Sequence, residues 1–262
     1  MKENIKAEYV DGKDFSTPKI LYKYRDWDND YHKTILLENK IYLSPPRDFE
    51  DKMDCNLPEK FPPKEELYNI FLEKSKQENP TRTRQEHRAF ARYWSEKSPL
   101  ANPRELSKLV SEFNDEFNER FGILSVTEDC TNEDMWKKYA NDSQGICIGF
   151  DTEKLFSVVG GGGEVIYDDK LPVIDFINDD FKTKHAKNIF FKDTSWAFEK
   201  EYRLHKFWKD NPSIADRNIS MPEDCIVEVI LGKNISEKNK NEITELVKEK
   251  YSNAKIMNMP NA

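Results

Sequence analysis

Residues 225–231 read Cys-Ile-Val-Glu-Val-Ile-Leu, and this stretch is the clearest indicator of the fold. Its β-branched and aliphatic side chains are typical of a strand buried in a sheet. An amphipathic helix is predicted next, over residues 236–251, with Ser236 as its N-terminal cap. Its apolar face carries Ile243, Leu246 and Val247. The C-terminal part therefore predicts one sheet strand with a helix that covers it.

Further strands are predicted upstream by alternation of apolar and polar residues and by aromatic enrichment. They lie at residues 20–25, 41–44, 122–127, 145–150 and 200–207. Residues 64–120 have a helical period instead, and the pairs Asn79-Pro80 and Ser98-Pro99 divide them into about three helices. Because helices do not alternate with strands, a parallel doubly wound sheet is excluded. We predict a single α+β domain over 1–262, with a split, mostly antiparallel sheet and a helical insertion at about 64–120.

The composition is that of a globular, charged protein. Of 262 residues, 41 are Lys or Arg and 49 are Asp or Glu, for a formal net charge of -8. Aromatic residues make up 12% of the chain, which excludes a disordered acidic tail. No apolar run approaches the ~18 residues of a membrane span, and the first residues lack the apolar core of a secretory signal. We expect a cytoplasmic protein with no membrane partner.

Cysteine and histidine spacing does not support a metal site. The four cysteines, Cys55, Cys130, Cys147 and Cys225, form no C-x-x-C pair, and the four histidines stand apart in sequence. We expect reduced thiols and no metal cofactor. The acidic balance argues against strong non-specific binding of duplex nucleic acid by the chain as a whole.

A series of motifs runs through the chain in a fixed order. Its members are Leu21-Tyr22-Lys23-Tyr24, Leu43-Ser44-Pro45-Pro46-Arg47-Asp48-Phe49, Gly122-Ile123-Leu124-Ser125, Met135 to Ala140, Gly145 to Asp151, Trp196 to Arg203 and Val229 to Gly232. The patterns W-x-x-Y-A, G-x-C-x-G-F-D and W-x-x-E-x-E-x-R are the most specific. Over about residues 20–235 the chain resembles a bacterial family known as domain of unknown function 2971. Two positions depart from that pattern: Glu50-Asp51-Lys52 replaces Asn-Asp-Pro, and Ser143 replaces a His.

Glu199 and Glu201 are the strongest candidates for chemistry. Along a strand, residues i and i+2 project to the same face, so both carboxylates would line one cleft. Two close carboxylates repel each other and one holds its proton more tightly, which suits acid–base or cation-stabilising work. Arg203 continues the same face. A solvated pair of surface glutamates, or a Glu–Arg cross-pair, fits the same spacing.

More distantly, the order of elements is similar to that of ADP-ribosyltransferases. This resemblance implies an ADP-ribosyltransferase-like fold and NAD as a substrate, with Glu201, supported by Glu199, stabilising the ribosyl cation. The residues implied in NAD binding are Lys23, Tyr24, Arg25, Ser125, Trp136 and Tyr139. Because the two residues share a helix face, core packing is the favoured role for Trp136, whereas packing and ligand contact fit Tyr139 equally. The resemblance also implies a toxin or phage-defence effector that modifies a protein or nucleic acid, with an antitoxin or defence-system partner.

Arg84, Arg88 and Arg92 form the clearest basic segment of the chain. They lie four residues apart and therefore share one face of a predicted helix. A solvated helix face and a phosphate-rich or nucleic-acid partner both fit this pattern, and with Arg203 these residues are candidate substrate contacts.

Two other functions fit the sequence. A nuclease would use Asp48, Asp51 and Asp54 with Glu199 and Glu201 to hold Mg²⁺ or Mn²⁺, since hard cations prefer carboxylate oxygens. A non-catalytic module would bind a partner chain through the helical insertion and keep its carboxylates for structure.

Overall fold

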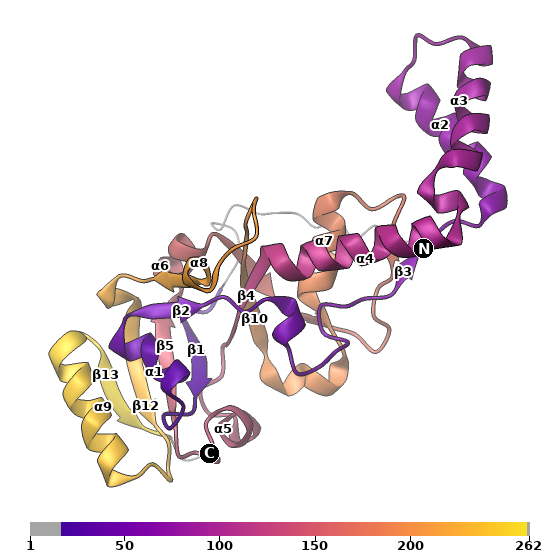
Figure 1. Cartoon of the computed structure of the whole chain (residues 1–262). Coiled ribbons are helices and arrows are strands. Elements are labelled where there is room, and N and C mark those ends of the chain that lie inside the picture. The colour runs from indigo at the N-terminus through magenta and orange to yellow at the C-terminus, as the bar shows by residue number, and fades with distance from the viewer. Residues whose placement is uncertain (1–16, 261–262) are drawn as a thin grey trace. The chain divides into compact units, whose positions relative to one another are not determined.

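The chain forms two compact units in a computed structural model that describes residues 17–260 (Figure 1). Of the described residues, the first unit contains 17–56, 120–171 and 188–260. The second contains residues 57–119 and 172–187. The predicted helical insertion thus lies in a unit that also includes residues 172–187, which the sequence did not assign to it.

A seven-stranded sheet forms the centre of the first unit, in the order β13-β12-β5-β1-β4-β10-β6. Neighbouring strands are antiparallel, except that β12 and β13 are parallel. The strands are β1 (Ile20–Arg25), β4 (Phe121–Thr127), β5 (Ile146–Asp151), β6 (Gly161–Glu164), β10 (Glu201–Phe207), β12 (Ile226–Leu231) and β13 (Lys255–Asn258). The prediction of an α+β protein with a mostly antiparallel sheet is confirmed.

Strands β1 and β4 separate near the middle of the sheet. They pair at Tyr22 and Thr127, whereas β1 pairs with β5 along its whole length, from Ile20 to Arg25. Beyond this single pair, the Lys23 ammonium spans the gap and donates a hydrogen bond of 2.5 Å to the carbonyl oxygen of Ser125. A cleft can therefore open between the two strands without loss of a paired ladder.

Helices cover both faces of the sheet because its central strands are apolar on both sides. Along β5, Ile146, Ile148 and Phe150 belong to one buried cluster and Cys147 to another. The first cluster packs against α1 (Asp30–Leu37), α6 (Thr152–Val159) and α9 (Glu237–Lys250). The second packs against α5 (Glu133–Tyr139). The predicted cap is confirmed, because the Ser236 hydroxyl accepts the backbone N–H of Asn239 at the start of α9.

The segment predicted as a strand at 41–44 lies outside this sheet. Its strand β2 (Lys40–Tyr42) pairs with β11 (Asn218–Ser220), which follows the short helix α8 (Ile214–Arg217). Ser44 forms an isolated bridge to Ile123. Pro45 and Pro46 then follow and have no N–H to donate, so the ladder stops there. Two further short strands, β7 (Ile166–Tyr167) and β9 (Phe191–Lys192), pair with each other.

The second unit is mainly helical, as the proline pattern predicted. It contains α2 (Leu67–Glu78), α3 (Arg84–Lys97) and α4 (Pro103–Arg120), and α7 (Phe181–Phe190) begins in it. The short strands β3 (Glu59–Lys60) and β8 (Ile174–Asp175) pair in parallel. Helices α2 and α3 form a hairpin whose buried interior holds a 2.9 Å hydrogen bond between Ser75 and His87. Within residues 17–260, no helix is both long and apolar enough to cross a membrane.

Replacing Gly145 with alanine is expected to destabilise the protein by about 1–3 kcal/mol, because overpacked backbone contacts cost about this much. A Cβ atom at Gly145 would lie 2.1 Å from the carbonyl oxygen of Arg25, so β1 or β5 would have to move. Urea denaturation measures the loss. Gly163→Ala is the matched control, because there the nearest atom lies 3.6 Å away, on Phe190. Equal stability of the two variants would contradict the close approach of Gly145 to β1.

Candidate functional site

A cleft of about 390 Å³ lies in the first unit, where β1 and β4 separate. Its walls come from β1, β4, α5, the loop after β2 and the segment that leads into β10. The residues expected from the sequence that line it are Lys23, Tyr24, Arg25, Ser125, Tyr139, Glu199 and Glu201. The structure therefore brings these residues together in one cavity, whose volume is within the range of about 300–1,000 Å³ that is usual for small-molecule sites.

Glu201 and Arg203 form a buried ion pair beside this cleft. Arg203 Nε lies 2.8 Å from Glu201 Oε1 and Nη2 lies 3.0 Å from Oε2, which is the two-pronged geometry of a strong guanidinium–carboxylate pair. Arg203 Nη2 also donates to Asp54 Oδ2 at 2.7 Å. The Arg203 side chain is fully buried, so it is not available to a substrate. Its role here is to hold the two carboxylates in place.

Lys192 is the second cation of this cluster. Its ammonium lies 2.6 Å from Glu199 Oε2, 3.3 Å from Glu201 Oε2 and 3.5 Å from Asp54 Oδ2. Burial alone would lower the pKa of Lys192, but the carboxylates outweigh it and raise the pKa above its usual range. Three carboxylates thus surround two cations, which leaves the cluster with a formal charge of −1.

Glu201 remains ionised in this environment. Burial would raise its pKa, but the charges of Arg203 and Lys192, with a hydrogen bond from Ser125, outweigh burial and lower the pKa to about 2. Its backbone N–H donates to the hydroxyl of Tyr167 at 2.9 Å. The carboxylate is therefore a fixed negative charge, and it does not act as a proton donor near neutral pH.

The two glutamates are brought together by a turn, and the prediction that both lie on one strand is wrong. Glu199 ends the 3-10 helix η4 (Thr194–Glu199), and Lys200 has a left-handed backbone with φ of 42°. Only Glu201 belongs to β10. Lys200 points outward to Asp129 Oδ2 at 3.0 Å, and both carboxylates point inward to Lys192. A buried cation, rather than strand alternation, determines their spacing.

The aromatic residues of the motifs divide between the core and the cleft. Trp136 is fully buried, donates from Nε1 to the carbonyl oxygen of Cys130 and packs edge-on against Tyr24, so it does not line the cleft. Tyr139 lines it and donates a 2.5 Å hydrogen bond to Glu199 Oε1. Burial, followed by the charge of Glu199, raises the pKa of Tyr139. Trp136 is thus a packing residue, whereas Tyr139 contacts the carboxylate cluster.

Two basic residues of β1, Lys23 and Arg25, line the cleft. Burial, followed by the charge of Arg25, lowers the pKa of Lys23, and burial lowers that of Arg25 to about 10. Arg25 is therefore cationic at neutral pH, whereas Lys23 holds its proton less firmly than an exposed lysine. Within residues 17–260, no carboxylate forms an ion pair with the Arg25 guanidinium. An anionic ligand could therefore pair with Arg25.

His32 lines the same cleft and is neutral near pH 7. Its Nδ1 donates to the carbonyl oxygen of Asp26 at 3.2 Å, because a carbonyl can only accept. Burial, followed by the charge of Arg25, lowers the pKa of His32 to about 4. Burial lowers the pKa of His205 on β10 to about 4 as well.

The free energy of unfolding is therefore expected to fall as the pH drops from about 6.5 to about 4. The unfolded chain protonates His32 and His205 near pH 6.5, whereas the folded chain resists protonation of these two residues until about pH 4, so acid favours unfolding. Urea titrations at pH 7, 6 and 5 measure the slope, and His32→Gln should make it shallower. A slope that is unchanged in His32→Gln would contradict a neutral His32.

The carboxylates proposed for a nuclease do not converge on an open position. Asp54, Glu199 and Glu201 all surround the ammonium of Lys192, which lies where a metal ion would have to bind. Asp48 and Asp51 line the cleft from the loop after β2. Residues 17–260 hold no group of three or more His, Cys, Asp or Glu side chains arranged for a metal ion.

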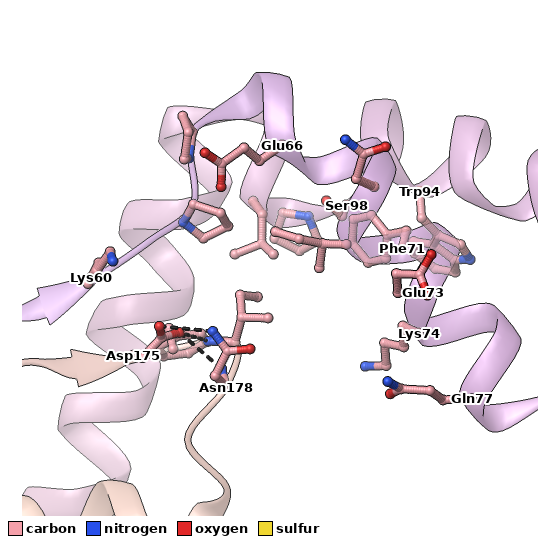
Figure 2. A pocket seen from close by; sticks show the side chains of 18 of the residues that line it. Lys60, Glu66, Phe71, Glu73, Lys74, Gln77, Trp94, Ser98, Asp175 and Asn178 are labelled. Atoms are coloured by element: carbon pink, nitrogen blue, oxygen red, sulfur yellow. Dashed lines mark hydrogen bonds between the residues drawn. The ribbon is translucent and has the colours of Figure 1, made fainter. Parts of the chain in front are cut away.

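A second cavity, of about 1110 Å³, lies in the helical unit. Figure 2 shows Phe71 and Trp94 from the α2–α3 hairpin on one side and Asp175 and Asn178 on another. Its carboxylates are dispersed, and the Asp175 carboxylate accepts hydrogen bonds from the backbone N–H and the side-chain amide of Asn178. Among the residues that line this second cavity, there is no buried cluster of charged groups like that of the first cleft. The arginines predicted as substrate contacts, Arg84, Arg88 and Arg92, lie on α3 in this unit and do not line this cavity.

Two contributors to the cleft were missed by sequence reasoning. Lys192 stands in an unremarkable Phe-Phe-Lys-Asp stretch, and only its neighbourhood in space shows its role. Trp196 was noted as part of a motif but was not expected at the site. Its ring lies 4.8 Å from the Lys192 ammonium and 3.9 Å from that of Lys138. The spacing within the W-x-x-E-x-E-x-R pattern was the available signal, since the tryptophan covers the cation that both glutamates bind.

Comparison with protein families gives one match, over residues 135–204, to a family described as "Protein of unknown function (DUF2971)". The matched segment runs from α5 into β10 and contains Tyr139, Lys192, Glu199, Glu201 and Arg203. It thus covers most of the buried charge cluster. Neither curated proteins nor solved structures gave a match to the chain.

Proposed function

We propose that the cleft binds NAD and that the protein is an ADP-ribosyltransferase-like enzyme, with an ADP-ribosyltransferase-like fold. One observation carries the proposal: the cleft holds a fixed, ionised carboxylate, Glu201, with Glu199 beside it, together with the cation Arg25, which has no ion-pair partner among the described residues. NAD requires both features, because its pyrophosphate is anionic and its reacting ribose becomes cationic.

The charge cluster suits the reacting end of NAD. Cleavage of the bond between nicotinamide and ribose builds positive charge on the ribose, and a carboxylate that is already oriented stabilises this charge without reorganisation. With its pKa of about 2, Glu201 is ionised throughout the neutral range. Arg203 and Lys192 fix its position, and the formal charge of −1 on the whole cluster still favours a cation. Glu199, held by Tyr139, supplies a second oxygen pair to which ribose hydroxyls can donate.

The basic residues of β1 suit the anionic end of the same molecule. Arg25 and Lys23 lie on β1, where the guanidinium can form two parallel hydrogen bonds to a phosphate. Aromatic rings of Tyr139 and Trp196 offer surfaces on which a nicotinamide ring can pack. The acceptor of the ADP-ribose would be a protein or a nucleic acid, as in a toxin or phage-defence effector.

The test follows nicotinamide release and NAD binding by the purified full chain. Wild type should release nicotinamide from NAD, transfer labelled ADP-ribose to a component of cell extract, and melt at a higher temperature when NAD is present. Addition of a chelator should leave these results unchanged. If wild type shows no nicotinamide release, no transfer of label and no thermal shift, the proposal is wrong.

Arg25→Gln tests the pyrophosphate contact. Loss of one charged hydrogen-bonding group should weaken NAD binding about tenfold to a hundredfold. Arg104→Gln, at an exposed position on α4, removes the same charge outside the cleft and is the matched control. Binding that is equally weakened by both variants, or by neither, would exclude Arg25 as the phosphate contact.

A further inference from the structure

Helix α3 carries a stripe of three exposed arginines, Arg84, Arg88 and Arg92, which we call the arginine stripe. Successive members are four residues apart, which corresponds to about 6 Å along the helix axis. The stripe lies beside the buried face of α3, which is formed by His87 and Ala91. It therefore presents a short, regular row of guanidinium groups to solvent.

These arginines have no ion-pair partners among residues 17–260, although the chain is acidic overall. The single polar contact of their side chains is a 3.4 Å hydrogen bond from Arg92 Nε to the carbonyl oxygen of Arg88. Lysines of the same unit behave differently. Lys74 pairs with Glu78, Lys76 with Glu73 and Lys108 with Glu112. The stripe is thus a local excess of positive charge that the unit does not neutralise.

The helix that carries the stripe is held firmly. Thr83 and Glu86 form a reciprocal capping box at its start, and the buried hydrogen bond between His87 and Ser75 fixes it against α2. Helix α3 also buries Ala91 completely. The spacing of the three arginines along the helix backbone is therefore set before any partner binds, which reduces the entropy that binding must overcome.

We propose that the arginine stripe binds the phosphate backbone of a nucleic acid. Guanidinium groups form paired hydrogen bonds with phosphate oxygens, and a linear polyanion supplies phosphates at regular intervals along such a row. Contacts of this kind read no bases, so binding is independent of sequence and depends strongly on salt. This inference concerns the helical unit and does not depend on the proposed reaction with NAD.

The test measures the fluorescence anisotropy of a labelled 20-nucleotide single-stranded RNA, and of a duplex DNA, with the full chain and without NAD. Wild type should bind at low salt, and log Kobs should fall with log salt with a slope of about −2, as expected for three phosphate contacts to a single strand. The variant R84Q/R88Q/R92Q should bind roughly 30-fold more weakly. The control K74Q/K76Q/K108Q, which removes three charges that are already paired, should bind like wild type.

Three results would overturn the inference. The first is that neither nucleic acid binds wild type at low salt. The second is that the control variant loses as much affinity as the stripe variant, which would indicate a general charge effect. The third is that polyglutamate binds through the stripe while RNA and DNA do not, which would identify the partner as an acidic protein. Circular dichroism of both variants verifies that the helices remain folded.

Discussion

Arg203→Met is expected to lower the free energy of unfolding by about 3–5 kcal/mol, because removal of one member of a buried ion pair leaves its partners buried without compensation. Arg203 is fully buried and contacts Glu201, Asp54 and the carbonyl oxygen of Ile189. Without it, three carboxylates would face the single cation Lys192. Urea denaturation at pH 7 measures the loss.

Two control variants make this result specific. Arg203→Lys keeps the charge but cannot form the paired hydrogen bonds to Glu201, so its stability should lie between those of wild type and Arg203→Met. Arg104→Met, at an exposed position on α4, should change stability by no more than about 0.5 kcal/mol. If Arg203→Met loses less than about 1 kcal/mol, the buried cluster does not contribute to stability as we argue.

Glu201→Gln is expected to reduce the rate of nicotinamide release by about 10²–10³-fold, the usual effect of removing one preorganised electrostatic contact. Glutamine keeps the shape of the side chain but removes the negative charge, and its amide group faces the donors of Arg203 and Lys192. The variant should therefore also be less stable than wild type. The rate must be measured at a temperature where circular dichroism shows the variant to be folded.

Comparison with Glu133→Gln distinguishes a specific effect of Glu201 on the reaction rate from the effect of losing one negative charge elsewhere in the protein. Glu133 is exposed on α5, and its partner Lys233 lies 3.7 Å away, so its replacement should not change the rate. Tyr139→Phe removes the hydroxyl that binds Glu199 and leaves all carboxylates charged. It should reduce the rate less than Glu201→Gln does. A folded Glu201→Gln protein with the wild-type rate would rule out Glu201 as the group that stabilises the ribosyl cation.

The W-x-x-E-x-E-x-R pattern has a structural explanation that is independent of activity. The Trp196 ring covers the ammonium of Lys192. Glu199 and Glu201 bind the same ammonium, and Arg203 holds Glu201 beside Asp54. This arrangement joins the segment before β10 to the loop after β2 through buried charges. The stability of Arg203→Met and the rate of Glu201→Gln therefore measure two separate consequences of one cluster.

The sequence by itself determined the coarse fold class and several of the main strands and helices, because these depend on short-range periodicity and on local breakers. The apolar run at 225–231 corresponds to β12, with Cys225 just before it, and Ser236 caps α9. The prolines and their neighbours separate α2, α3 and α4 as predicted. Residues 20–25 and 122–127 form β1 and β4, as their alternation indicated.

Only the tertiary structure decided how the candidate site is built. Asp54 is 149 residues from Arg203 in sequence, and no local pattern predicts that they form an ion pair. The left-handed backbone of Lys200 places Glu199 and Glu201 around Lys192, whereas a regular strand was predicted there. The separation of β1 from β4 opens the cleft, and it depends on pairing between distant strands. Buried charges select their partners by proximity in space, which the order of residues along the chain does not specify.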